Sequence, residues 1–123
     1  MSYDIKIEKR PNYLMVTLSG NGTLSGSVNA TQMILQECAN LKCHKILVDY
    51  RNLDVPTGQF EDLYLTEYVS HSRFREIIRR VAVVHSSSKN KSATSVVTIC
   101  QNKGLIAKAF EDCGVAEQWI YRE

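Results

Sequence analysis

The stretches KILVDY (45–50) and RVAVV (80–84) decide the fold of this chain. Each contains a short continuous apolar run, Ile46–Val48 in the first and Val81–Val84 in the second, where other strands would alternate apolar and polar residues. A strand that helices cover on both faces has this pattern, because neither face meets water. The two runs are therefore predicted to lie side by side at the centre of a layered α/β structure.

Two alternating segments precede the first of these runs. Apolar and polar residues alternate over 4–8 and again over 13–19, which is the period of a half-buried strand. Pro11 and Asn12 between them favour a turn, because Pro presets φ and Asn tolerates unusual backbone angles. The N-terminal part of the chain is therefore predicted to form an antiparallel hairpin.

Apolar residues at three- and four-residue spacing predict four helices. The first starts after a cap at Ser25 or Ser27 and ends near Lys42. It buries one stripe, made of Val28, Thr31, Leu35, Cys38 and Leu41. The second follows Pro56 and frays around 70–75, and the third covers 93–100 and ends at Asn102-Lys103-Gly104.

A strand over 105–110, with Ile106 and Phe110 on one face, precedes the fourth helix. Asp112 is the expected cap of that helix, whose packing residues are Val115, Ala116, Trp119 and Ile120. The predicted order is β-β-α-β-α-β-α-β-α. Strands that alternate with helices imply a mixed, mostly parallel five-stranded sheet with four helices. A length of 123 residues fits a single domain, 1–123.

Composition narrows the classes of function. The net charge is +2, and Lys and Arg are scattered along the sequence, so nucleic acid is not an expected partner. Apolar runs are too short for membrane insertion, and the first residues lack the apolar segment of a signal peptide. The four cysteines fit buried, reduced side chains, which predicts a cytoplasmic protein.

The element order resembles the STAS domain, the fold of the SpoIIAA-type anti-sigma-factor antagonists. The C-terminal third carries most of the likeness: Arg80–Val84, a helix, the stretch Ile106–Glu111 in which a strand ends in Phe before an acidic turn, and a last helix with Ala116-Glu-Gln-Trp-Ile120. SpoIIAA-like domains of unknown function end in a similar way. The resemblance implies a regulatory domain that binds a protein partner.

The segment after the central strand departs from the antagonist pattern. In those proteins the third strand leads to Asp-Ser-Ser-Gly at the start of the second helix, and a partner kinase phosphorylates a Ser there. Here the stretch is shorter, keeps Asp49 and Gly58, and lacks the double Ser. Thr57 is the one residue that could accept the phosphate, and it could equally serve as a helix cap.

Other chemistry-bearing residues are better explained as structural. The loop 86–92 has no glycine for a phosphate cradle. Cys38, Cys43 and His44 lack the second ligand pair of a zinc site, so no metal and no cofactor is predicted. His71 and His85 have no identifiable partner. Asp49 ends a strand, as an aspartate of a receiver domain does, but this sequence lacks the acidic pair that a receiver domain carries after its first strand.

The second helix is apolar over more than one stripe. The surplus residues could widen the core face, line a cavity or form an interface. We therefore expect a non-enzymatic domain that binds a protein partner or forms a homodimer. A carrier or sensor of an apolar, lipid-like small molecule beneath the second helix is the alternative. The expected contact residues are Asp49, Asn52, Asp54, Thr57, Gly58, Phe60, Tyr64 and Tyr68.

Overall fold

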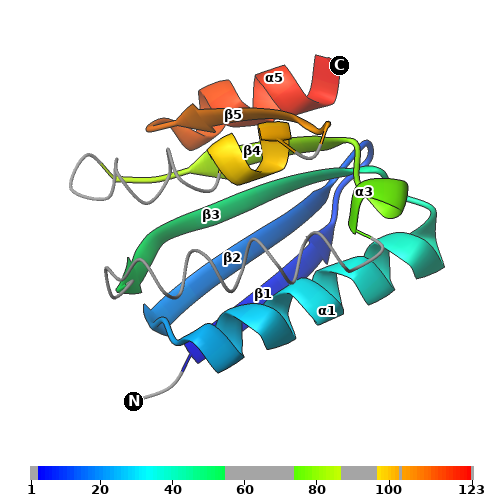
Figure 1. The fold of residues 1–123 in the computed structure, drawn as a ribbon. Coiled ribbons are helices and arrows are strands. Elements are labelled where there is room, and N and C mark those ends of the chain that lie inside the picture. The colour runs from blue at the N-terminus through cyan, green and yellow to red at the C-terminus, as the bar shows by residue number, and fades with distance from the viewer. Residues whose placement is uncertain (1–2, 55–73, 87–96, 103, 123) are drawn as a thin grey trace.

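The computed structural model describes residues 3–54, 74–86, 97–102 and 104–122, and they contain a five-stranded sheet in the order β1-β2-β3-β4-β5 (Figure 1). β1 pairs antiparallel with β2, as the predicted hairpin requires, and the remaining neighbours pair in parallel. The fold is therefore the predicted mixed, mostly parallel sheet. The strands are β1 (Tyr3–Lys9), β2 (Leu14–Asn21), β3 (Lys45–Asp54), β4 (Arg80–Val84) and β5 (Ile106–Phe110).

The two apolar runs pair directly at the centre of the sheet. Ile46 lies opposite Val81, and Val48 lies opposite Val83. The side chains of Val81–Val84 are almost fully excluded from water. The prediction on which the α/β assignment depended is thus confirmed.

Helices cover both faces of the sheet (Figure 1). α1 (Leu24–Leu41) packs on one face, where Ile34 and Cys38 meet Val16 and Ile46 in one apolar cluster. α5 (Cys113–Arg122) packs on the other face. Because side chains alternate along a strand, odd and even residues of β4 enter different clusters: Val81 and Val83 on the α1 side, Ala82 and Val84 on the α5 side.

α1 begins earlier than predicted. Its cap is Thr23, whose Oγ1 accepts a hydrogen bond from the Gly26 N–H at 3.0 Å, so Ser25 and Ser27 were the wrong candidates. The helix ends at Lys42, which adopts a left-handed conformation with φ of 53°. Cys38 is buried as predicted, but Leu41 is exposed, while Ala30 and Ile34 belong to the buried stripe and were not predicted.

The C-terminal elements follow the prediction more closely. The Oδ1 of Asp112 accepts hydrogen bonds from the backbone N–H of Gly114 and of Val115, at 2.7 and 3.3 Å, and so caps α5. Ala116 and Ile120 are fully buried against the sheet. Val115 was expected to pack there and is instead exposed.

The sequence predicted four helices, and the helices of the described residues differ from that set. Besides α1 and α5, the described residues contain the short helix α3 (Phe74–Ile77), in a region where the sequence predicted fraying. Residues 97–102 are helical, near the predicted third helix. The helix expected after Pro56 lies outside the described residues. Within those residues, no helix combines the length and the apolar character needed to cross a membrane.

Candidate functional site

β3 is longer than predicted and carries the candidate site at its carboxyl end. The strand continues through Asp54, so Asn52 and Asp54, expected in a loop, belong to it. The pairing with β2 shows why the sequence pattern hid this extension. Thr17 lies opposite Asp49, but Ser19 lies opposite Asn52, so β3 contains one extra residue, a β-bulge.

The bulge changes which side chains reach the core. In a regular strand, Tyr50 and Leu53 would point to opposite faces, because they are three residues apart. With the extra residue, both join the apolar cluster on the α1 side of the sheet. Arg51 and Asn52 between them are exposed.

Asp49 and Arg51 hold the bulge in shape. Asp49 is 7% exposed. Its Oδ1 accepts from the backbone N–H and the Nε of Arg51 at 3.2 and 2.9 Å, and its Oδ2 accepts from Nη2 at 2.7 Å. These bonds to Asp49 raise the pKa of Arg51. The carboxylate of Asp49 is thus paired within its own strand and organises the backbone there.

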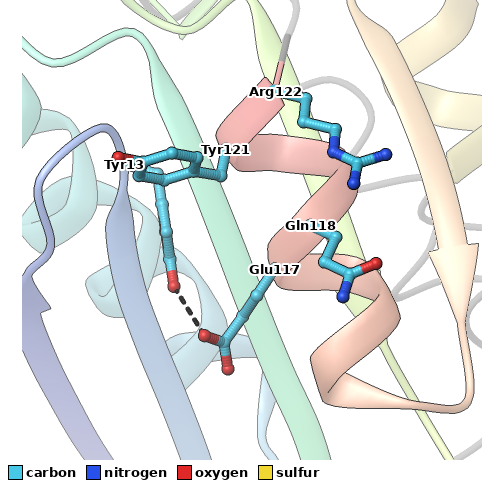
Figure 2. Close-up of a pocket in the computed structure, with 5 residues that line it drawn as sticks. All are labelled: Tyr13, Glu117, Gln118, Tyr121 and Arg122. Atoms are coloured by element: carbon cyan, nitrogen blue, oxygen red, sulfur yellow. Dashed lines mark hydrogen bonds between the residues drawn. The ribbon is translucent and has the colours of Figure 1, made fainter.

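Glu117 links the start of α5 to the sheet (Figure 2). It accepts a hydrogen bond from the Tyr13 hydroxyl at 3.1 Å and another from the Cys113 thiol at 3.4 Å. Burial, together with Glu117, raises the pKa of Tyr13 to about 12 and that of Cys113 to about 11. Cys113 is therefore a protonated thiol at neutral pH and a poor nucleophile.

A shallow pocket of about 220 Å³ lies beside this link. It is lined by Tyr13, Glu117, Gln118, Tyr121 and Arg122. Figure 2 shows Glu117 reaching toward the Tyr13 hydroxyl, while Gln118 and Arg122 project away from it. The pocket is small for a ligand of drug size, and its groups do not form a catalytic arrangement. The apolar pocket predicted beneath the second helix lies outside the described residues.

Three of the four cysteines are buried, and the fourth, Cys113, is half-buried. All four cysteines are free thiols, and burial raises the pKa of Cys38 to about 12 and of Cys100 to about 11. The Cys43 thiol donates to the Lys45 carbonyl at 3.3 Å. Where the chain is described, no group of three or more potential ligands is arranged to hold a metal ion.

Two buried polar groups lie at or near the carboxyl ends of the central strands. His85 is 4% exposed; its backbone N–H donates to the Phe110 carbonyl at 2.9 Å, and its Nδ1 is 2.8 Å from the Ser86 carbonyl oxygen. These contacts fit the expected role of a satisfied histidine. The Tyr50 hydroxyl is buried without a hydrogen-bond partner among the described residues, and no pattern in the sequence signalled it.

The structure separates the predicted contact residues into three groups. Asp49 is buried and paired, whereas Asn52 and Asp54 are exposed at the end of β3. Glu111 and Asp112, which were not among the predicted contact residues, are also exposed; they follow the end of β5, which lies two strands away from β3 in the same sheet. The remaining residues, Thr57, Gly58, Phe60, Tyr64 and Tyr68, lie outside the described part of the chain.

Two solved structures are similar to this chain in fold. An uncharacterised protein of the DUF3478 family with a SpoIIAA-like fold, from Shewanella loihica PV-4, is 24% identical, with a TM-score of 0.61 over 96% of this chain and 93% of that chain. An anti-sigma factor antagonist from Mycobacterium paratuberculosis is 10% identical, with a TM-score of 0.64 over 98% and 95% of the two chains. No family model matches the sequence, and no curated protein matches it either.

The sheet order, the helices on its two faces and these likenesses define the class of protein. The chain has the SpoIIAA-like, or STAS, fold, which confirms the resemblance found in the sequence. Identities of 24% and 10% establish the fold alone. Fold by itself does not determine function, which depends on the site that a particular chain places on it.

Proposed function

We propose that this chain is a non-enzymatic regulatory domain that acts by binding a protein partner. The contact surface is the carboxyl end of β3 and the segment that follows it, comprising Asp49, Asn52, Asp54, Thr57, Gly58, Phe60, Tyr64 and Tyr68. The shared fold with a protein named as an anti-sigma factor antagonist supports this class of function. Thr57 remains the candidate phosphoacceptor within the surface.

The Asp49–Arg51 arrangement is the observation that carries the proposal. One of its three hydrogen bonds holds the backbone N–H of Arg51, and the other two hold its guanidinium, so the backbone just before the exposed Asn52 and Asp54 is tied to the strand. A preorganised surface loses less conformational entropy when a partner binds. Among the described residues of this edge, the exposed carboxylates are Asp54, Glu111 and Asp112, and the exposed cation Arg51 is already paired with Asp49, which leaves an excess of negative charge. The partner should therefore present basic side chains.

The proposal also includes the location of the protein in the cell and its domain organisation. We place the protein in the cytoplasm, where reduced cysteines persist. We also treat residues 1–123 as one domain, because the strands from both ends of the chain belong to the same sheet.

Site-specific photocrosslinking in cells tests the partner surface. A benzophenone amino acid at Asn52 should give a discrete crosslinked product, while the same probe at Gln36, exposed on α1, should not. The charge-reversal variant Asp54→Lys should reduce the Asn52 product by about tenfold, because like charges then face each other across the interface. Equal crosslinking at both positions, or none at Asn52, would refute the proposal.

A homodimer would use the same surface, and the crosslink separates the two cases. Mass spectrometry of the product from Asn52 identifies either a different protein or a second copy of this chain. Light scattering of the purified chain then gives its mass in solution. A product containing only this chain, together with a dimeric mass, would assign the surface to self-association and exclude the regulatory partner.

A further inference from the structure

Cations gather at the amino ends of the parallel strands. The pairing register places Lys45 beside Arg80, and Arg80 beside Ile106. The backbone N–H of Arg79 donates to the His44 carbonyl at 2.8 Å, and that of Ile106 donates to the Arg79 carbonyl at 3.0 Å. The beginnings of β3, β4 and β5 are thus in direct contact.

The last turns of α1 and α5 lie at this same end of the sheet, on its opposite faces (Figure 1). Lys42 caps the end of α1, three residues before β3. The Lys45 Nζ donates to the Ile120 carbonyl at 3.3 Å, and the Asn12 Nδ2 donates to the Tyr121 carbonyl at 2.6 Å. These bonds bring the last turn of α5 to this end of the sheet. We name the surface the basic edge; its cations are Lys9, Arg10, Lys42, Lys45, Arg79, Arg80 and Arg122.

These cations are scattered along the sequence, but the fold brings them to one end of the sheet, because each begins, ends or adjoins an element there. The described carboxylates toward this end of the sheet include Glu8, which is 3.5 Å from Arg10, Glu37 in the C-terminal part of α1, and Glu76 in α3. A net charge of +2 for the whole sequence conceals this local excess.

Apolar side chains are exposed at the same end of the sheet. Leu41, the last residue of α1, is 40% exposed; Ile106, the first of β5, is 50% exposed; and Tyr121, in the last turn of α5, is 54% exposed. Burying these side chains in water-poor surroundings would be favourable. A partner for this surface must therefore offer both negative charge and an apolar layer.

We propose that the basic edge binds the surface of an anionic membrane. Lipid headgroups attract the cations, and the apolar boundary below them accepts Leu41 and Ile106. Tyr121 is suited to the level of the lipid headgroups, where its ring can contact apolar chains while its hydroxyl stays in a polar environment. A nucleic acid or an acidic peptide would pair with the cations but would leave the aliphatic side chains in water.

This inference does not depend on the proposed partner surface. The basic edge lies at the amino ends of the parallel strands, whereas Asn52 and Asp54 lie at the carboxyl end of β3. A domain held by its basic edge would point its carboxyl edge away from the membrane. Membrane and partner could therefore be bound at the same time.

Vesicle flotation with the full chain tests the charge requirement. The protein should float with phosphatidylcholine vesicles that contain phosphatidylglycerol and not with phosphatidylcholine alone, and added salt should weaken the binding. The variant Lys42→Asn with Arg79→Gln should lose about tenfold or more in affinity. The control Lys6→Gln with Lys108→Gln removes the same charge from exposed positions in the middle of β1 and β5, and should bind as the unmodified chain does.

A second pair of variants tests the apolar requirement. Leu41→Ser with Tyr121→Ser should reduce vesicle binding severalfold, while Met33→Ser with Val115→Ser, exposed apolar residues outside the basic edge, should not. Thermal melting establishes that each variant is folded. Absence of binding to anionic vesicles, or equal losses in test and control variants, would overturn the proposal. Binding to polyglutamate or single-stranded DNA without binding to vesicles would overturn it as well.

Discussion

The Asp49 carboxylate accepts hydrogen bonds from the backbone and from the guanidinium of Arg51, two residues further along the same strand. The pair spans the point where β3 gains an extra residue relative to β2. It thus connects a local irregularity of the backbone to the exposed end of the strand. Burying a carboxylate costs free energy unless its oxygens accept hydrogen bonds, and Arg51 donates those hydrogen bonds to Asp49.

Asp49→Ala is expected to destabilise the fold by about 1–3 kcal/mol, because the exposed bulge loses the acceptor that fixes its backbone. Urea denaturation measures the loss. Asp54→Ala, an exposed carboxylate on the same strand, should change the free energy of unfolding by no more than about 0.5 kcal/mol. Equal effects of the two substitutions would show that Asp49 does not organise the bulge.

Tyr50→Phe is expected to leave stability unchanged or to raise it by up to about 1 kcal/mol. The hydroxyl is buried without a partner among the described residues, and an unpaired buried polar group costs free energy. Tyr13→Phe is the matched control, since it removes a hydroxyl that donates to Glu117 and should cost about 0.5–1.5 kcal/mol. A loss of more than about 1 kcal/mol in Tyr50→Phe would mean that its hydroxyl has a bonded partner in solution.

Stability should fall in alkaline solution. The folded state favours the neutral forms of Cys113, whose pKa rises from 9.0 to about 11, and of Tyr13, whose pKa rises from 10.0 to about 12. Their contributions are complete below pH 9 and are lost as pH rises through about 11 and 12. The difference between the urea midpoints at neutral pH and at about pH 10.5 measures this fall in stability. Tyr13→Phe with Cys113→Ser should make it shallower, and an unchanged slope would contradict the assignment.

Thiol labelling should occur in a fixed order. Cys113 is half-buried at the start of α5, whereas Cys38, Cys43 and Cys100 are buried. A thiol-specific reagent at neutral pH should modify Cys113 first, and slowly, because its raised pKa leaves little thiolate. The others should react after denaturation. Cys113→Ser should abolish the first phase and Cys100→Ser should not. A first phase that survives Cys113→Ser in the folded protein would contradict the order.

Periodicity was sufficient to predict the layers of the fold. Continuous apolar runs at Ile46–Val48 and Val81–Val84 identified the central pair of strands, and alternation identified the hairpin. Each of these signals is local, because it depends on which faces of one segment are buried. Asp112 was predictable as a cap for the same reason, since its hydrogen bonds stay within three residues.

Features that depend on two distant segments were not predictable in this way. The bulge in β3 is defined by the register against β2, so the strand was predicted to end before Asn52. The basic edge unites Lys9, Lys45 and Arg122, which no spacing rule connects. The Tyr50 hydroxyl has no hydrogen-bond partner among the described residues because of what packs around it, and a sequence pattern does not record that packing.

The extra residue in β3 also affects how this strand tolerates changes of length. Removing Arg51 or Asn52 would restore strict two-residue alternation beside Thr17 and Ser19. Tyr50 and Leu53 would then stand two positions apart, so Leu53 would still face the core and Asp54 would still face away from it. Inserting one residue between Tyr50 and Leu53, with the bulge kept in place, would instead turn Leu53 out of the core and Asp54 inward, so an insertion here should be more harmful than a deletion.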